Sequence, residues 1–78
     1  MKHLLKILPE YFVAVQIGLK KSELRINDRD FKAGDKVILR EFKDDYTGES
    51  IEVIITHVLK RVMGMHKDYC IFSFKIRT

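Results

Sequence analysis

Apolar and polar residues alternate with a period of two over much of the chain, and this pattern predicts β-strands. The alternation is clearest near the C-terminus. One face of the strand predicted there carries Cys70, Phe72, Phe74 and Ile76. The other face carries Ser73, Lys75 and Arg77. A strand with this pattern packs one face against a core, so we expect a mostly β domain.

The same period predicts more strands along the chain. Residues 36–43 form one strand, and residues 2–8 form a short strand or an extended lead-in. From Ser22 onward the period of two begins again. Beyond residue 50 the apolar positions are Ile51, Val53, Ile55 and Leu59, which alternate with Glu52, Thr56 and Lys60. His57 falls on the apolar face of that strand, where a partly buried sheet histidine is expected.

One segment breaks the period of two and predicts a short helix. Pro9 and Glu10 open it, because proline suits the first helical turn and a carboxylate there complements the helix dipole. Gly18 is the natural stop. The apolar stripe of this helix comprises Tyr11, Phe12, Ala14, Val15 and Leu19. Residues 12–15 also suit a strand by propensity, but the flanking proline and glycine favour the helix.

Short turns join the predicted strands. Residues 27–30 are a polar break, Gly34 and Asp35 make a tight turn, and residues 44–49 and 63–68 form two further connections. Short connections require antiparallel neighbours, and five strands in 78 residues should curl towards a barrel. We therefore predict an α+β, mostly β fold: a small antiparallel barrel of about five strands with one short helix near the N-terminus. Residues 1–78 are expected to form a single domain.

The strand that starts at Ser22 carries the most concentrated charge pattern. Its period places Leu24 and Ile26 on one face and Lys21, Glu23 and Arg25 on the other. A carboxylate between two cations is either a charged ladder on the surface or part of a cleft between helix and barrel. In a cleft, Arg25 could bind a phosphate or carboxylate with its forked guanidinium, and Glu23 could hold the cations in place.

Charge and cysteine content narrow the classes of partner and compartment. The formal net charge is +4, which favours anionic partners, nucleic acid first among them. No apolar run reaches the roughly 18 residues of a membrane span, and the N-terminal residues lack the features of a signal peptide. With one cysteine the chain can form no internal disulfide, in agreement with a cytoplasmic location.

The sequence gives little support for a metal site or for a nucleophilic cysteine. His3, His57 and His66 are widely separated, and Cys70 has no cysteine partner, so no zinc-type spacing exists. Cys70 lies on an apolar strand face and is expected to behave as a small hydrophobic residue. The chain has no phosphate-binding glycine loop and no dinucleotide motif. We expect neither a metal nor a cofactor.

A family resemblance adds to this picture. The segment Gly18-x-Lys20-x-x-Glu23-x-Arg25 resembles the G-x-K-x-x-E-x-R signature of ASCH domains, a branch of the PUA-like superfamily. Residues 31–39 resemble the F-x-x-G-D strand entry of that family, and residues 6–12 resemble the lead-in of a small bacterial and phage branch of uncharacterised function. The resemblance covers nearly the whole chain in the right order. It implies a PUA-like barrel with a cleft beside the helix, lined by Lys20, Glu23 and Arg25.

The resemblance also implies two classes of function. PUA-like proteins commonly bind RNA or handle modified nucleobases. Some ASCH relatives hydrolyse the acyl amide of acetylated cytidine with a lysine that matches Lys20, a threonine, and a glutamate from an inserted segment. This chain has Glu23 at the threonine position, and residues 63–68 are too short for the insertion. That mechanism is therefore doubtful for this chain.

The leading hypothesis is a module that binds RNA or another nucleic acid through a basic row. Tyr46 or Tyr69 is a candidate for stacking on a base. The alternative is a small hydrolase acting on a modified nucleoside or base, which uses Lys20 and Glu23, with Glu23 as acid or base. A third possibility is an accessory fold that binds a protein partner. The predicted nucleic-acid-binding residues are Lys20, Lys21, Glu23, Arg25, Arg29 and Lys32.

Overall fold

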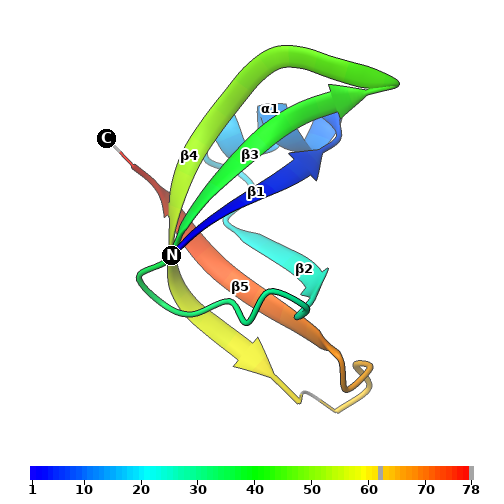
Figure 1. Ribbon diagram of the computed structural model, residues 1–78, viewed down its shortest axis with the longest axis vertical. Helices are drawn as coiled ribbons and strands as arrows, with labels where there is room; N and C mark the ends of the chain where they lie inside the picture. Colours follow the sequence, from blue (N-terminus) through cyan, green and yellow to red (C-terminus); the bar gives the residue numbers. More distant parts are fainter. Residues whose placement is uncertain (62, 78) are drawn as a thin grey trace.

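The structure is a five-stranded sheet with one short helix near the N-terminus, as predicted (Figure 1). It is a computed structural model that describes residues 1–61 and 63–77. The helix is α1, Pro9–Gln16, and the strand order across the sheet is β1-β3-β4-β5-β2. The strands are β1 Lys2–Ile7, β2 Ser22–Ile26, β3 Lys36–Lys43, β4 Asp45–Lys60 and β5 Tyr69–Ile76.

The long strand β4 gives the sheet its curl. Its first half pairs with β3 and its second half with β5, so it runs through both parts of the sheet (Figure 1). A register shift between Ile55 and His57 marks a β-bulge, which bends a strand and increases its twist. The sheet is a curled half-barrel whose two edge strands, β1 and β2, do not pair with each other.

One strand pair departs from the antiparallel expectation. β1 and β3 are parallel, whereas the β2–β5, β3–β4 and β4–β5 pairs are antiparallel. The argument from short loops does not apply to β1 and β3, because the connection between them contains both α1 and β2. A crossover of that length is what a parallel pair needs.

The core lies on one face of the curled sheet and is covered by α1 and by the loop before β3. The helix contributes Phe12 and Val15, and the loop contributes Phe31. The strands add Leu5, Ile7, Val37, Leu39, Val53, Ile55, Cys70, Phe72 and Phe74. All of the apolar positions predicted for the last strand are in or against this core.

The helix buries a narrower stripe than the sequence predicted. Tyr11 is 48% exposed, and Leu19, which lies beyond the end of α1, is 79% exposed. An eight-residue helix has only two turns, so few of its side chains can face the core at once.

The bulge in β4 corrects the expectation for His57. The inserted residue, Thr56, reverses the alternation, so that Val58 packs against the core and His57 is exposed.

The start of β4 corrects the expected connection at residues 44–49. Residues 45–49 belong to the strand rather than to a loop, and the hairpin turns at Asp44, whose φ is 64°.

Candidate functional site

The end of α1 places Lys20 at the start of β2. Gly18 has a φ of 84°, a left-handed conformation that glycine adopts without steric cost. The chain can therefore turn back, and the backbone N–H groups of Leu19 and Lys20 both donate to the carbonyl of Ala14, each at 2.9 Å. These bonds fix the backbone of Lys20 beside the end of the helix.

Strand β2 turns its charged face inward. Glu23 is only 7% exposed, whereas Leu24 and Ile26 are 56% and 51% exposed. The predicted alternation is therefore correct, but it is the charged side that is buried. Glu23 lies opposite Phe72 of β5 and shares its face of the sheet. This orientation supports the cleft interpretation of the charged row over the surface ladder.

We call the cluster formed by Lys20, Glu23 and Arg25 the charged triad. The Lys20 ammonium lies 2.8 Å from one carboxylate oxygen of Glu23, and Arg25 Nε donates to the other oxygen at 2.9 Å. Lys20 also donates to the carbonyl of Ser22 at 2.6 Å. The side chains of Lys20 and Arg25 are 25% and 29% exposed, so Glu23 holds two cations that still reach solvent.

The charged triad borders a hollow of about 420 Å³, which we call the helix cleft. Besides the triad, its walls are Lys6, Ile7, Leu8, Tyr11 and Leu24. The Lys20 ammonium lies 5.6 Å from the centre of the Tyr11 ring. The cleft thus presents three cations, one carboxylate and a half-exposed aromatic ring.

The other predicted site residues, Lys21, Arg29 and Lys32, lie outside the charged triad. Arg29 donates from Nη1 to the carbonyl of Leu4 in β1 at 2.7 Å. Lys32 is exposed and forms an ion pair with Asp30 at 3.4 Å. Lys21 is exposed, and its backbone carbonyl accepts a bond from Phe74. Neither Lys21 nor Lys32 lines the helix cleft.

Arg25 and Arg29 bridge the open side of the half-barrel. Arg25 donates from Nη2 to the carbonyl of Lys6 at 2.6 Å. Arg29 donates from Nη1 to the carbonyl of Leu4. Both acceptors belong to the edge strand β1, whose free carbonyls need partners. The two arginines therefore hold the β2 side of the molecule to β1 where no strand pairing exists.

A second hollow, of about 250 Å³, adjoins the helix cleft, and we call it the arginine pocket. Lys6 and Arg25 line both hollows. Its full lining is Leu4, Leu5, Lys6, Arg25, Arg29, Arg40 and Tyr46. Sequence reasoning overlooked Lys6 and Arg40, because they meet only through the parallel pairing of β1 with β3.

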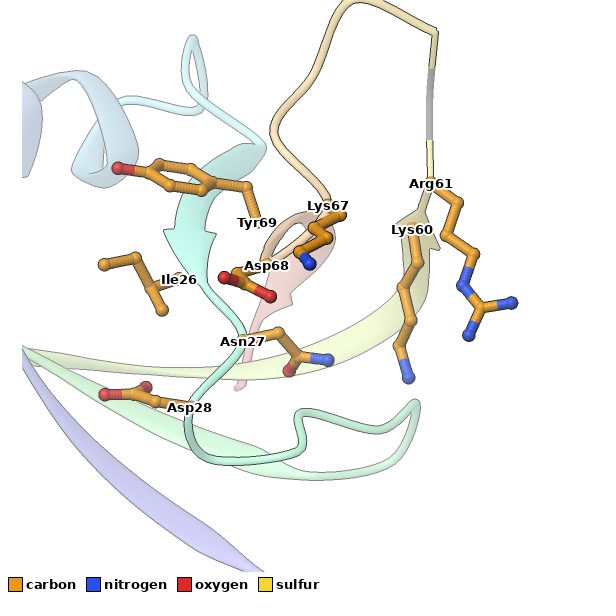
Figure 2. A pocket seen from close by; sticks show the side chains of 8 residues that line it. All are labelled: Ile26, Asn27, Asp28, Lys60, Arg61, Lys67, Asp68 and Tyr69. Carbon is orange, nitrogen blue, oxygen red and sulfur yellow. The ribbon is translucent and has the colours of Figure 1, made fainter.

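A third hollow lies at the C-terminal end of β2, beside the end of β4 and the start of β5, and it has a mixed charge. It measures about 460 Å³ and is lined by Ile26, Asn27, Asp28, Lys60, Arg61, Lys67, Asp68 and Tyr69 (Figure 2). We call it the β4–β5 pocket. Figure 2 shows the Arg61 side chain extending away from the other labelled side chains. Two carboxylates accompany its three cations. Tyr69, a predicted candidate for base stacking, lines it, but none of the predicted charged residues does.

A separate polar cluster joins His3 to Asp35. Both residues are buried, and His3 Nε2 lies 2.8 Å from Asp35 Oδ2. Burial by itself would raise the pKa of Asp35. The hydrogen bonds from His3, the Met1 amine and the Lys32 backbone N–H outweigh burial and hold that pKa below its ordinary value. The His3 ring also packs edge-on against Phe31, with the ring centres 4.7 Å apart.

The remaining candidates are the Cys70 thiol and the potential metal ligands. Burial raises the pKa of the Cys70 thiol, which keeps it in the unreactive protonated form. Within residues 1–61 and 63–77, no group of three or more His, Cys, Asp or Glu side chains is placed to hold a metal ion. In the same part of the chain, no helix is long and apolar enough to cross a membrane.

A comparison with family models decides where this chain belongs. Residues 2–74 match the model described as Domain of unknown function (DUF3850). The chain belongs to the DUF3850 family. The match includes every predicted site residue.

Two further proteins resemble this DUF3850 domain. An "Uncharacterized 12.9 kDa protein in GpA 3'region" of Escherichia phage P2 is 39% identical over 57 residues, which are 72% of this chain. Those residues are 52% of the phage protein, so the chain spans about half the length of that relative. The crystal structure of hypothetical protein PH0355 superimposes with a TM-score of 0.69 at 17% identity, covering 99% of this chain and 100% of that one. At that identity the likeness shows the fold alone.

Proposed function

We propose that this DUF3850 domain is an ASCH/PUA-like module that binds RNA or a nucleotide in the helix cleft. The observation that carries the proposal is the buried carboxylate of Glu23, which holds Lys20 and Arg25 beside an open hollow. Long cationic side chains lose entropy when a ligand orders them, so cations that are already fixed bind at a lower cost. The segment that resembles the ASCH signature contains these three residues together with Gly18.

The walls of the helix cleft suit a nucleotide. Its volume of about 420 Å³ lies within the range of about 300–1,000 Å³ typical of small-ligand sites. Lys6, Lys20 and Arg25 supply donors for phosphate or base oxygens. Tyr11, which is 48% exposed, offers a ring face on which a base can stack.

A binding experiment tests this proposal. The expected result is that a pool of RNAs and single-stranded DNAs binds the chain with an affinity that falls as salt rises, since phosphate contacts release counterions. The double variant Lys20→Ala/Arg25→Ala should weaken binding at least about tenfold, a loss of about 1.4 kcal/mol. The double variant Lys60→Ala/Lys67→Ala removes the same charge elsewhere and should have a much smaller effect. Equal losses in the two double variants, or binding that ignores salt, would refute the proposal.

The hydrolase alternative rests on the direct contact between Lys20 and Glu23, at 2.8 Å. A lysine that acts as a base or nucleophile must be a neutral amine. Lys20 instead donates to a carboxylate and to a carbonyl, and both oxygens of Glu23 already accept from cations. These contacts favour binding over catalysis. Turnover of acetylated cytidine by the intact domain, abolished by Lys20→Ala, would reverse that preference.

A further inference from the structure

The arginine pocket has the most one-sided charge of the hollows described above. Its walls contain four cations, Lys6, Arg25, Arg29 and Arg40, and no carboxylate. Only Arg25 among them forms an ion pair within the part of the chain that the structure describes. The helix cleft, by contrast, contains Glu23.

Lys6 and Arg40 are held together in spite of their like charge. They are directly opposite each other on β1 and β3. Like charges in that position destabilise a sheet. The Arg40 guanidinium stacks 3.8 Å from the centre of the Tyr46 ring, and the Lys6 ammonium lies 5.6 Å from it. The Lys6 ammonium also lies 4.5 Å from the centre of the Phe42 ring. These aromatic rings attract the two cations, but an anion between the cations would relieve their repulsion.

We infer that the arginine pocket is a phosphate-binding site formed by Lys6, Arg29, Arg40 and Tyr46. Arginine donates two parallel N–H bonds to phosphate oxygens, and Arg29 uses one of its nitrogens on Leu4, so other donors remain. The volume of about 250 Å³ is below the range of about 300–1,000 Å³ for small-molecule sites, so the pocket suits one phosphate group better than a whole nucleotide.

The site extends the proposed function but does not require it. Because Lys6 and Arg25 line both hollows, a nucleotide in the helix cleft would have its phosphate close to the arginine pocket. The phosphate can be a terminal monoester or a backbone diester. The monoester carries about −2 charge at neutral pH, so inorganic phosphate is a suitable minimal probe.

The test is a titration of the ¹⁵N-labelled chain with inorganic phosphate, followed by NMR at constant ionic strength. Resonances of the arginine pocket should shift and saturate, and sodium acetate should shift them less. Arg40→Gln should weaken phosphate binding at least about tenfold, and Lys60→Gln, which removes one charge from the β4–β5 pocket, should change it less than about twofold. Lys6→Gln replaces an exposed side chain of the same pocket and serves if Arg40→Gln disturbs the fold.

Equal effects of Lys6→Gln, Arg40→Gln and Lys60→Gln would overturn the site, because they would indicate diffuse attraction. Short RNAs with and without a 5′-phosphate then identify the source. A loss in Arg40→Gln for both RNAs indicates a backbone diester, and a loss for the phosphorylated RNA alone indicates a terminal monoester. Phosphate binding without RNA binding would refute the proposed function and leave this site standing. RNA binding without a phosphate response would refute this site and leave the proposed function standing.

Discussion

Two buried carboxylates in this small domain, Glu23 and Asp35, have similar partners but different surroundings. Each is less than a tenth exposed and is held by cationic or hydrogen-bonding groups. The His3 side chain that holds Asp35 is 3% exposed, whereas the Lys20 and Arg25 side chains that hold Glu23 are 25% and 29% exposed.

The difference separates a structural cluster from a candidate binding site. Around Asp35 the donors are the buried His3 ring, the Lys32 backbone N–H and the more exposed Met1 amine, and they tie the start of β1 to the loop before β3. Around Glu23 the carboxylate is the inner group, and its two cations face the helix cleft with donors to spare. A buried carboxylate by itself therefore says little about function, and the more informative property is whether its side-chain partners line a hollow.

The first prediction concerns Asp35 and has the largest expected effect. Asp35→Ala leaves buried His3 without its carboxylate partner and removes the bond to the Lys32 backbone N–H. We expect a loss of about 3 kcal/mol in the free energy of unfolding. Urea denaturation measures it, and Asp28→Ala, the same change at an exposed carboxylate, should cost less than about 1 kcal/mol. Similar losses in the two variants would show that the contacts of Asp35 do not stabilise the fold.

The second prediction applies the same comparison to Glu23. Glu23→Gln leaves Lys20 and Arg25 close together without a negative charge, and we expect a loss of about 1–3 kcal/mol in stability. Unlike substitutions at Asp35, it should also change RNA or nucleotide affinity, because the two cations lose their fixed positions. Glu49→Gln, an exposed change of the same kind, should alter neither property. Unchanged affinity in folded Glu23→Gln would remove Glu23 from the site.

The third prediction uses the pKa of Asp35, which lies below its ordinary value of 3.8 in the folded chain. Ionised Asp35 therefore stabilises the fold at pH values above the ordinary value, and this contribution is lost as the pH falls through the folded-state pKa. Urea denaturation between about pH 7 and about pH 2 should show the loss. Asp35→Asn should have a smaller dependence on acid than the parent chain. An unchanged acid dependence would contradict the assignment.

The smallest expected effect tests the orientation of β2. Leu24→Ala shortens a side chain that is 56% exposed and should cost less than about 1 kcal/mol. Leu5→Ala makes the same change at a position that is 5% exposed and should cost about 2–5 kcal/mol. Denaturation of both variants measures the difference. Equal costs would mean that β2 buries its apolar face and that the charged triad points to solvent.

Local sequence signals predicted the elements well. The alternation of Cys70, Phe72 and Phe74 predicted both β5 and its buried face, and Pro9 and Gly18 predicted the helix. These signals act over a few residues, because backbone preferences and side-chain period are local properties. They failed at the β-bulge near Thr56, where one inserted residue reverses which side chains face the core.

For the candidate site, the sequence by itself determined that Glu23 and Arg25 share one strand face, and the resemblance to the ASCH signature grouped Lys20 with them. Their spacing places Glu23 and Arg25 on one face of a strand, and Gly18 allows the turn that brings Lys20 to its start. The sequence therefore predicted which residues share the charged face of β2. It did not predict that this face is the buried one, because burial depends on what lies across the open side of the sheet.

Only the tertiary structure decided how the arginine pocket forms. Lys6, Arg29 and Arg40 come from three separate elements, and the parallel pairing of β1 with β3 places Lys6 beside Arg40. Arg29 reaches the same place through its bond to β1. Pairing between distant strands depends on how the whole core packs, and no local pattern encodes it.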